Sequence, residues 1–407
     1  MPARLLAHLD GRRERVIHLQ RELTVRPAVG PDNNGPGEAD RADWLEREMS
    51  RAGLGRVRRH DCPDPRCPCG FRPNISVRVQ GKRDQTLWLI AHLDIVPPGD
   101  ETLWHHPPYD LRVEGDYVYG RGVEDNQQAI VTGLLAAESL LACGITPDLS
   151  LGLLFVADEE TGMHYGLPHV LNNAPDLIGP HDLLLVPDIG NSAGDMVETA
   201  EKSRLWLKVT VNGKQCHAAS PQDGVNSLRA AAACILAMEN LENAFPGADP
   251  LFAPPCSTFV PTRKEANVEN INTMPGKDVF YLDCRVLPDR DLADVEAQVR
   301  ALAHEAAGRC GATAEVERIC GEQATPATPA DAPVVRRLLD ALRRHRGIEG
   351  KLCGTGGQTL ALCLRRRGLP AAAWSTLTSN AHAPDEKSDI RASIADAGTV
   401  LTMLFDA

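Results

Sequence analysis

The first half of the chain alternates short, wholly apolar runs with helix-like segments, and this alternation limits the possible folds more than any other feature. Residues 86–91, 149–157 and 183–187 read TLWLIA, LSLGLLFVA and LLLVP, and residues 129–141 have the composition of a helix. Strands that are apolar on both faces are typical of a parallel sheet covered by helices on both sides. The sequence therefore predicts an α/β domain with a mostly parallel sheet.

The pattern changes after residue 203, where residues 204–212 (RLWLKVTVN) alternate apolar and polar side chains like a half-exposed strand. Further elements are expected in this order: a helix at 225–243, strands at 257–262 and 279–286, a helix at 292–307 and a strand at 313–319. This order, strand–helix–strand–strand–helix–strand, is that of a ferredoxin-like α+β unit.

A Pro-rich connection at residues 324–333 leads back to an α/β pattern. It predicts helices at 334–345 and 359–367 and a strand at 371–375. We therefore expect a catalytic domain in two pieces, residues 1–201 and 322–407, with a smaller domain inserted at residues 202–321.

Charge and composition narrow the classes of function. The chain has 407 residues and a formal net charge of −12, which argues against nucleic-acid binding because phosphate contacts need a basic surface. No apolar run approaches the length of a membrane span, and the first residues lack a secretory apolar stretch, so a cytoplasmic protein is expected. The 12 cysteines are expected to be reduced thiols. Cys62, Cys67 and Cys69 are predicted to lie in a Pro-rich surface loop, with a metal or redox site as the alternative.

Carboxylates and a histidine follow the ends of the predicted strands. They are His92 and Asp94 after residues 86–91, Asp125 in GRGVEDN, Glu159 and Glu160 after residues 149–157, and Asp188 after residues 183–187. The carboxyl ends of parallel strands form the edge at which open α/β sheets bind ligands. Asp94 lies on the same side of an extended segment as His92, and its carboxylate can accept a hydrogen bond from that imidazole. Each motif alone is more typical of a solvated surface, but their succession, together with the distant His382, predicts a site.

With these motifs the sequence resembles the dinuclear-zinc amidohydrolases of metallopeptidase family twenty. That family includes aminoacylase, acetylornithine deacetylase, succinyl-diaminopimelate desuccinylase, carboxypeptidase G and several di- and tripeptidases. The resemblance covers nearly the whole chain, in the family's order and separations. It rests on HLD at 92–94, GRGVEDN at 120–126, DEETG at 158–162, PD at 187–188, HAASPQDGVNS at 217–227 and SNAHAPDE at 379–386. It implies a zinc-exopeptidase-like α/β domain with an inserted ferredoxin-like lid, and a homodimer formed through that lid.

The resemblance also implies a metal site and a general base. Asp125 would bridge two divalent metal ions, with His92 and Asp188 completing one site and Glu160 and His382 the other. The peptide bond between Asp125 and Asn126 would be cis. One histidine, one terminal carboxylate and one shared carboxylate per ion suit zinc, with cobalt or manganese as alternatives. Glu159 would take a proton from the attacking water, and Asp94 would hold His92.

The inserted domain supplies further candidates through the same resemblance. His217 would reach across a dimer into the partner's active site and stabilise the oxyanion, although its spacing alone is typical of a loop histidine. Asn272 and Arg285 match positions that hold the substrate's carbonyl or carboxylate. A planar guanidinium suits a free carboxyl group, although Arg285 alone would be interpreted as a strand-end salt bridge. Gly356 and Gly357 match a turn whose backbone amides approach the substrate carboxylate.

The expected reaction is hydrolysis of an amide in a small N-acyl amino acid, by a deacylase of the desuccinylase or acetylornithine type. The alternative is a dipeptidase or aminopeptidase, and Asp188 favours it because deacylases of the family tend to carry Glu there. Gln358 and Thr359 follow the Gly-rich turn, where family members commonly carry Asp. A non-catalytic, ligand-binding relative would have lost a metal ligand or the general base, and this chain keeps both.

His105 and His106 lie in the segment LWHHPPYD. They are expected to belong to a Pro-rich loop, with the wall of the substrate pocket as the alternative.

Overall fold

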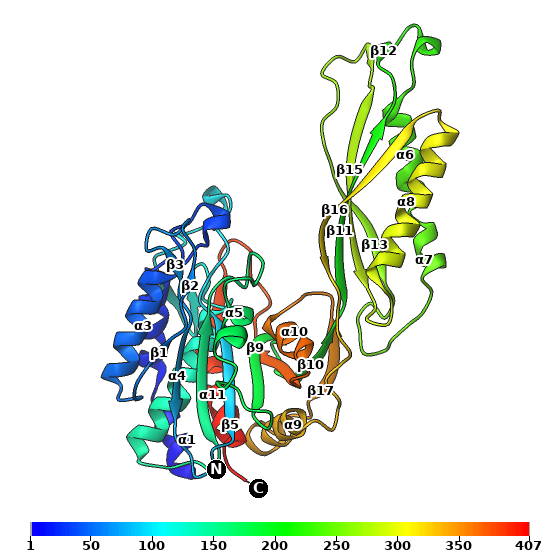
Figure 1. Cartoon of the computed structure of the whole chain (residues 1–407). Coiled ribbons are helices and arrows are strands. Elements are labelled where there is room, and N and C mark those ends of the chain that lie inside the picture. Colours follow the sequence, from blue (N-terminus) through cyan, green and yellow to red (C-terminus); the bar gives the residue numbers. More distant parts are fainter. Residues whose placement is uncertain (1, 407) are drawn as a thin grey trace. The chain divides into compact units, whose positions relative to one another are not determined.

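The computed structural model describes residues 2–406, which divide into two compact units (Figure 1). Unit 1 is formed by Met1–Thr199, Thr328–Leu352 and Thr359–Ala407, and unit 2 by Ala200–Ala327 and Cys353–Gln358. Unit 2 thus consists of an inserted stretch of about the expected extent and the short segment Cys353–Gln358.

Unit 1 is built on a mostly parallel sheet, as predicted. Within residues 2–406, eight strands form it in the order β1-β4-β8-β5-β9-β18-β10-β17. Their bounds in that order are Arg58–Arg59, Ile75–Val79, Ser150–Val156, Thr86–His92, Leu183–Asn191, Ala371–Thr376, Met196–Glu201 and Lys351–Thr355. The central strands β8, β5, β9 and β18 run parallel to one another, while β4 and β10 pair antiparallel to their neighbours β8 and β18. The α/β class expected from the apolar runs is therefore confirmed.

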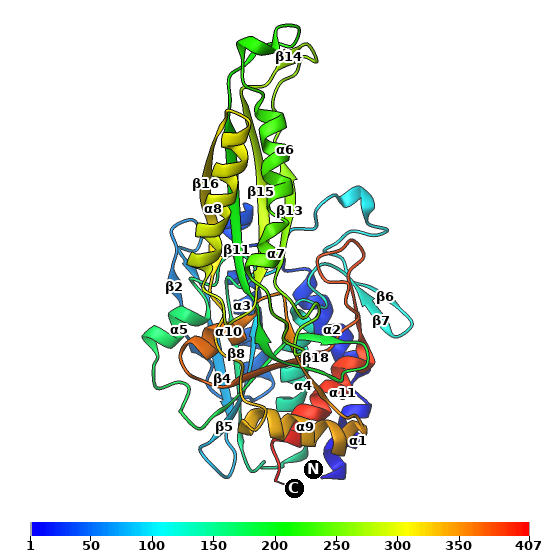
Figure 2. The ribbon, with the colours of Figure 1, turned by 90° about the vertical axis from the view of Figure 1, so that its right-hand side faces the viewer.

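Helices cover both faces of this sheet. The helices of unit 1 are α1 (Ala3–Asp10), α2 (Arg13–Thr24), α3 (Ala39–Arg51), α4 (Gln127–Cys143), α5 (Leu167–Asn173), α9 (Pro333–Arg346), α10 (Leu360–Arg366) and α11 (Ile390–Met403). One apolar core joins α1, α2, α3, α4, α9 and α11 to the sheet, and a second joins α5 and α10 to its other face. The unit thus has three layers, helix–sheet–helix (Figure 2).

Strand β5 shows why the predicted strands are apolar throughout. Leu87 and Leu89 belong to the first core, whereas Trp88 and Ile90 belong to the second. Because successive side chains of a strand point to opposite faces, a strand between two helix layers needs apolar residues at every position. All seven residues of β5 are buried, including His92 at its carboxyl end.

Unit 2 contains the predicted ferredoxin-like arrangement. Its elements are β11 (Ser203–Asn212), α6 (Ser227–Ala237), α7 (Asn240–Ala244), β13 (Thr258–Lys264), β15 (Lys277–Val286), α8 (Leu292–Arg309) and β16 (Thr313–Glu322). The strands form an antiparallel sheet in the order β13-β15-β11-β16, with α6 and α8 side by side on one face (Figure 1). The single helix expected at residues 225–243 is divided into α6 and α7, and the side chain of Asn226 caps the first by accepting from the backbone N–H of Arg229.

Shorter elements complete the chain. They are β2 (Cys62–Pro63), β3 (Phe71–Arg72), β6 (Arg112–Glu114), β7 (Tyr117–Tyr119) and β19 (Lys387–Asp389) in unit 1, β12 (Cys216–His217) and β14 (Thr273–Met274) in unit 2, and the 3₁₀ turns η1 (Pro31–Asn33), η2 (Glu101–Leu103) and η3 (Pro221–Asp223). Across residues 2–406, no helix combines the length and the apolar composition needed to cross a membrane.

Candidate metal centre

The predicted site residues of unit 1 gather at the carboxyl edge of the parallel sheet. His92 is the last residue of β5 and pairs in register with Val156, the last residue of β8. Glu159 and Glu160 follow β8 by a few residues, and Asp188 lies in β9, the other neighbour of β5. Asp125 and His382 come from segments without regular secondary structure and are brought to the same edge by the fold.

Five side chains form two groups that share one carboxylate. His92, Asp125 and Asp188 form the first group, and Asp125, Glu160 and His382 form the second, with the ligand atoms of each group within 4.8 Å of one another. His92 Nε2 lies 2.9 Å from Asp125 Oδ1 and 3.7 Å from Asp188 Oδ1. His382 Nε2 lies 3.1 Å from Asp125 Oδ2 and 3.2 Å from Glu160 Oε1. The two oxygens of Asp125 thus face different groups.

These separations fit a pair of tetrahedral divalent ions. Ligand atoms about 2.0–2.1 Å from a tetrahedral zinc ion lie roughly 3.3 Å from one another, close to the distances within each group. Imidazole nitrogen and carboxylate oxygen are donor types that zinc accepts, and the shared Asp125 could bridge two ions. The five residues could therefore hold two metal ions.

The protonation of the carboxylates reflects their crowding. Burial raises the pKa of Glu160 to about 7, the charge of Asp125 adds to the rise, and His382 opposes it. Burial also raises the pKa of Asp188. The hydrogen bond from His92 lowers this pKa, and the charge of Asp125 raises it. Like charges held together in a buried site are unfavourable unless cations compensate them. The electrostatics of the group therefore favour a bound cation.

The histidines respond in the opposite direction. Hydrogen bonds with Asp125 and Glu160 raise the pKa of His382 to about 10 despite its burial. Burial alone would lower the pKa of His92, but its contacts with Asp125, Asp188 and Asp94 raise it well above its usual value. The surrounding carboxylates thus favour the positively charged form of both imidazoles when no metal ion competes for the ring nitrogens.

Asp94 holds His92 through a different atom from the one expected. The ring nitrogen Nδ1 of His92 lies 3.0 Å from the backbone oxygen of Asp94, while the nearer carboxylate oxygen is 3.6 Å away, beyond hydrogen-bonding distance. The Asp94 carboxylate instead accepts from the backbone N–H groups of Glu159, at 3.1 Å, and Glu160, at 3.0 Å. The side chain of Asp94 therefore orients the turn that carries both glutamates.

Glu159 lies in surroundings that disfavour its charge. Burial raises the pKa of Glu159 well above its usual value, and the carboxylates of Asp188, Glu160 and Asp125 raise it further, while His92 opposes them. A carboxylate that is unstable in its charged form accepts a proton readily. Such a group is suited to act as a general base beside the two ligand groups.

Asn126 contacts the first ligand group, a role that its sequence motif alone does not predict. Its amide Nδ2 donates to Asp188 Oδ1 at 2.8 Å and to the backbone oxygen of Pro187 at 3.0 Å. The peptide bond between Asp125 and Asn126 is cis, as the family resemblance implies. Asn126 thus orients one carboxylate of the first group.

A buried ion network behind Asp94 was also missed. Arg72 donates to Glu38 at 2.8 Å and lies 3.4 Å from Asp158, and all three side chains are buried. Asp158 accepts in turn from Tyr165 N and from the hydroxyl of Thr161, which closes the turn that contains Glu159 and Glu160. No local pattern connects residues 34 or 86 positions apart, so only a structure could reveal this network.

In unit 2, His217 and Asn272 are brought together by the pairing of β12 with β14. His217 is opposite Thr273 in this pairing, and the backbone oxygen of Asn272 accepts from Ala218 N at 2.9 Å. The His217 ring nitrogen Nδ1 accepts from Ala219 N at 3.0 Å, so that Nε2 carries the proton in the neutral ring. Both side chains are exposed.

Arg285 and Gly356 also contact each other within unit 2. The Arg285 guanidinium donates to the Gly356 backbone oxygen at 2.7 Å and makes two bonds to Asp283, at 2.7 and 3.0 Å. The strand-end salt bridge considered as an alternative for Arg285 therefore exists. Gly357 lies in the same turn, where its backbone oxygen is 3.4 Å from the hydroxyl of Thr355.

The remaining histidine and cysteine candidates lie outside the two ligand groups. His105 donates through its backbone N–H to Asp385 at 3.0 Å, and the ring of His106 packs edge-on against Trp104 and Tyr119. Cys62, Cys67 and Cys69 are free thiols in or beside the short β2–β3 pair. Among residues 2–406, no group of three potential metal ligands includes a cysteine.

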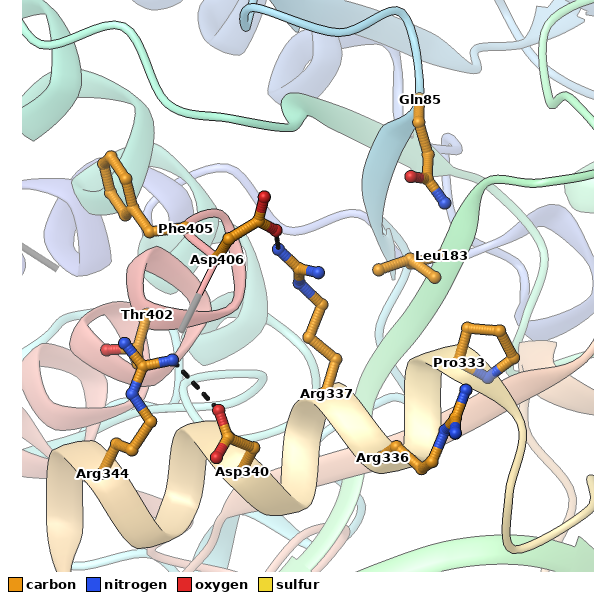
Figure 3. Close-up of a pocket in the computed structure, with 10 residues that line it drawn as sticks. All are labelled: Gln85, Leu183, Pro333, Arg336, Arg337, Asp340, Arg344, Thr402, Phe405 and Asp406. Atoms are coloured by element: carbon orange, nitrogen blue, oxygen red, sulfur yellow. Dashed lines mark hydrogen bonds and ion pairs between the residues drawn. The ribbon is translucent and has the colours of Figure 1, made fainter.

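A surface cavity of about 280 Å³ lies at the other end of the parallel strands (Figure 3). It is lined by Gln85, just before β5, by Leu183 at the start of β9, and by arginines of α9. Arg337 of α9 pairs with Asp406 near the C-terminus, whereas Arg344 pairs with Asp340 one turn away on the same helix. A seven-residue strand spans roughly 20 Å, so this cavity is separate from the metal-ligand edge.

Comparison with known proteins agrees with the fold and identifies metallohydrolase relatives. The profile of peptidase family M20/M25/M40 matches residues 88–406. A protein of Methanococcus maripaludis described as an uncharacterised metallohydrolase is 32% identical over 415 residues, covering 96% of this chain and 99% of the relative. A succinyl-diaminopimelate desuccinylase of Bordetella petrii is 26% identical over 84% of each chain. The solved structure of the dipeptidase Dug1p from Saccharomyces cerevisiae has a TM-score of 0.78 at 13% identity, covering 99% of this chain and 97% of its own.

The fold and these matches define a metallohydrolase that acts on carbon–nitrogen bonds. The chain belongs to peptidase family M20/M25/M40, and the family resemblance of its motifs is confirmed.

Proposed function

We propose that this chain hydrolyses the amide bond of a small N-acyl amino acid, with two divalent metal ions held by His92, Asp125, Glu160, Asp188 and His382. The observation that carries the proposal is the pair of ligand groups that share Asp125 at the carboxyl edge of the sheet, beside Glu159. When bound, such ions polarise the scissile carbonyl and acidify an attacking water. Zinc is the proposed metal, with cobalt or manganese as alternatives.

Glu159 moves the proton in this proposal. Its carboxylate takes a proton from the attacking water, and the same oxygen then gives that proton to the departing nitrogen. The position of Glu159, next to the ligand Glu160 and among the charges of Asp188, Glu160 and Asp125, supports this role. Asp94 positions Glu159 by accepting from its backbone N–H.

Residues of unit 2 are proposed to bind the substrate. His217 stabilises the oxyanion in the active site of a partner subunit, which requires a homodimer. Asn272, Arg285 and the Gly356–Gly357 turn hold the substrate's carbonyl or carboxylate. The bond of Arg285 to the Gly356 backbone oxygen supports a shared role for these two groups, whereas Asn272 lies beside His217 near the opposite end of β15.

A deacylase is the leading proposal for the substrate class, supported by the match to a succinyl-diaminopimelate desuccinylase over most of both chains. A dipeptidase or aminopeptidase is the second candidate, and Asp188 favours it because that position tends to be Asp in the aminopeptidases of the family. A panel of N-succinyl, N-acetyl and N-carbamoyl amino acids assayed against unblocked dipeptides separates the two. Cleavage of free-amine dipeptides alone would refute the deacylase.

The Glu159→Ala variant tests the mechanism. It is expected to retain two metal ions per chain, because Glu159 is not among the five ligands, and to lose at least about 100-fold in kcat. Metal content is measured by mass spectrometry of the desalted protein, and kcat on the best substrate of the panel. A variant with full activity would refute the proposed base, and a wild-type chain with metal but no hydrolytic activity would favour a ligand-binding relative.

A further inference from the structure

Two buried carboxylates link the segments that carry Asp125 and His382. Residues 120–126 and 377–386 contain no helix or strand, so no regular backbone ladder fixes the ligands they carry. Glu386 belongs to the segment of His382, and Glu124 to that of Asp125. Both side chains are buried, at 0% and 2% exposure. Neither residue is among the five candidate metal ligands.

Glu386 binds the backbone of the Asp125 segment. Its Oε2 accepts from Arg121 Nη1 at 2.6 Å and from Gly122 N at 2.9 Å. Its Oε1 accepts from Glu124 N at 2.9 Å and from Asp125 N at 3.0 Å. The Glu386 carboxylate therefore accepts from three backbone N–H groups of one short segment. One of these belongs to Asp125, whose side chain is shared by the two ligand groups.

Glu124 makes the reciprocal contacts. Its Oε1 accepts from Thr378 N, and its Oε2 accepts from Asn380 N at 2.9 Å. Asn380 in turn closes the loop around His382, because its Oδ1 accepts from Lys387 N at 3.0 Å and its Nδ2 donates to Asp385 O at 3.1 Å. The position of His382 thus depends on bonds that begin at Glu124.

We infer that the Glu124–Glu386 pair positions Asp125 and His382 for metal binding, so that its loss weakens the metal position formed by Asp125, Glu160 and His382. This inference rests on the proposed function. Hydrogen bonds to a charged carboxylate are shorter and stronger than neutral ones, which suits the pair to fix irregular backbone. Outer contacts of this kind typically change metal affinity by about 10–100-fold when removed.

The two metal positions should respond unequally. His92 and Asp188 lie on strands β5 and β9, which are held by the sheet, whereas His382 lies on the irregular segment fixed by the pair. Asp125 contributes to both metal positions. Only the position with Glu160 and His382 would have two misaligned ligands, Asp125 and His382, if the pair were lost. A purely structural role would instead lower thermal stability and leave both affinities unchanged.

The test is a zinc titration of metal-free protein against a chromophoric chelator, with the thermal midpoint measured on the same samples. Wild type is expected to bind two zinc ions. Glu386→Gln and Glu124→Gln are expected to bind the first with nearly wild-type affinity and the second about 10–100-fold more weakly. Gln keeps the size of the side chain but replaces one acceptor oxygen with a donor that faces backbone N–H groups.

Glu138→Gln is the matched control. Glu138 is also a buried glutamate of unit 1 that binds arginine, at 2.5 Å from Arg15, yet it contacts neither ligand segment. It should lose stability and keep both zinc affinities. Glu386→Asp retains the charge and should fall between wild type and Glu386→Gln, which supplies a test if the Gln variant does not fold.

The outcomes separate the two proposals. Wild-type affinities for both zinc ions in Glu386→Gln and Glu124→Gln would refute the positioning role, as would an equal loss of affinity in Glu138→Gln. Wild-type protein that binds fewer than two zinc ions would refute the proposed function itself. If the double variant Glu124→Gln/Glu386→Gln loses less affinity for the second zinc ion than the product of the two single losses, the two glutamates act together on one metal position.

Discussion

Glu160 Oε1 lies 3.2 Å from His382 Nε2, and each side chain shifts the pKa of the other. Burial raises the pKa of Glu160 to about 7, and hydrogen bonds with Asp125 and Glu160 raise the pKa of His382 to about 10. Protons therefore occupy the metal position formed by these residues near neutral pH. A metal ion must displace those protons, because only the neutral imidazole and the charged carboxylate are ligands. Metal binding should therefore strengthen as pH rises.

A pH series of thermal midpoints checks this expectation. The raised pKa of Glu160 gives the metal-free protein stability that is present below the usual value and is lost as pH rises through about 7. The raised pKa of His382 gives stability that is lost only as pH rises through about 10. The gain in thermal midpoint from added zinc should thus grow between pH 6 and about 9. A gain that is constant or shrinks over this range would contradict the proposed ligands.

At the same scale, the sequence predicted side-chain identity better than side-chain contacts. His92, Asp125, Glu160, Asp188 and His382 stand in motifs and meet in the structure as two groups. Asp94 contacts His92 more closely through its backbone oxygen than through its carboxylate, because spacing along a strand fixes the face of a side chain but not the direction of a backbone carbonyl. Contacts between Glu124 and Asn380 depend on loops 256 residues apart, which no local pattern encodes.

At the scale of elements, the predictable strands are those in the middle of the sheet. The apolar runs correspond to β5, β8 and β9, which are covered on both faces. Strands β10 and β17 were not predicted, because MVETAE and KLCGT mix apolar with charged or small residues. They lie at one end of the sheet order, where a wholly apolar sequence is not required.

Close packing of β5 against β8 gives a prediction for one glycine. Gly152 pairs in register with Trp88, and a Cβ atom at Gly152 would lie 2.3 Å from the indole ring. Gly152→Ala should therefore lower the free energy of unfolding by about 1–3 kcal/mol through overpacking. Thermal and urea unfolding, followed by circular dichroism, measure the change.

Gly308 in α8 is the control for this substitution. A Cβ atom at Gly308 would meet nothing within 4 Å, and alanine favours helix over glycine by about 1 kcal/mol. Gly308→Ala should leave stability unchanged or raise it. Equal stability of Gly152→Ala and wild type would contradict the packing described for β5 and β8.

At the scale of the whole molecule, the proposed role of His217 requires two subunits. Glu159→Ala and His217→Ala proteins should each be nearly inactive. When the two are mixed under conditions that exchange subunits, each mixed dimer has one site with an intact Glu159 and an intact His217 from the partner. Random exchange should restore about a quarter of wild-type activity. An assay of the mixture against the separate variants measures this, and no recovery despite subunit exchange would place His217 outside the partner's site.

The central claim is that five side chains distant in sequence hold two metal ions on either side of Asp125. Diffraction at the zinc absorption edge from crystals of the zinc-bound protein tests it most directly. The account predicts two anomalous peaks per chain, one beside His92 and Asp188 and the other beside Glu160 and His382, with Asp125 between them. A single peak, or peaks away from these residues, would contradict the account.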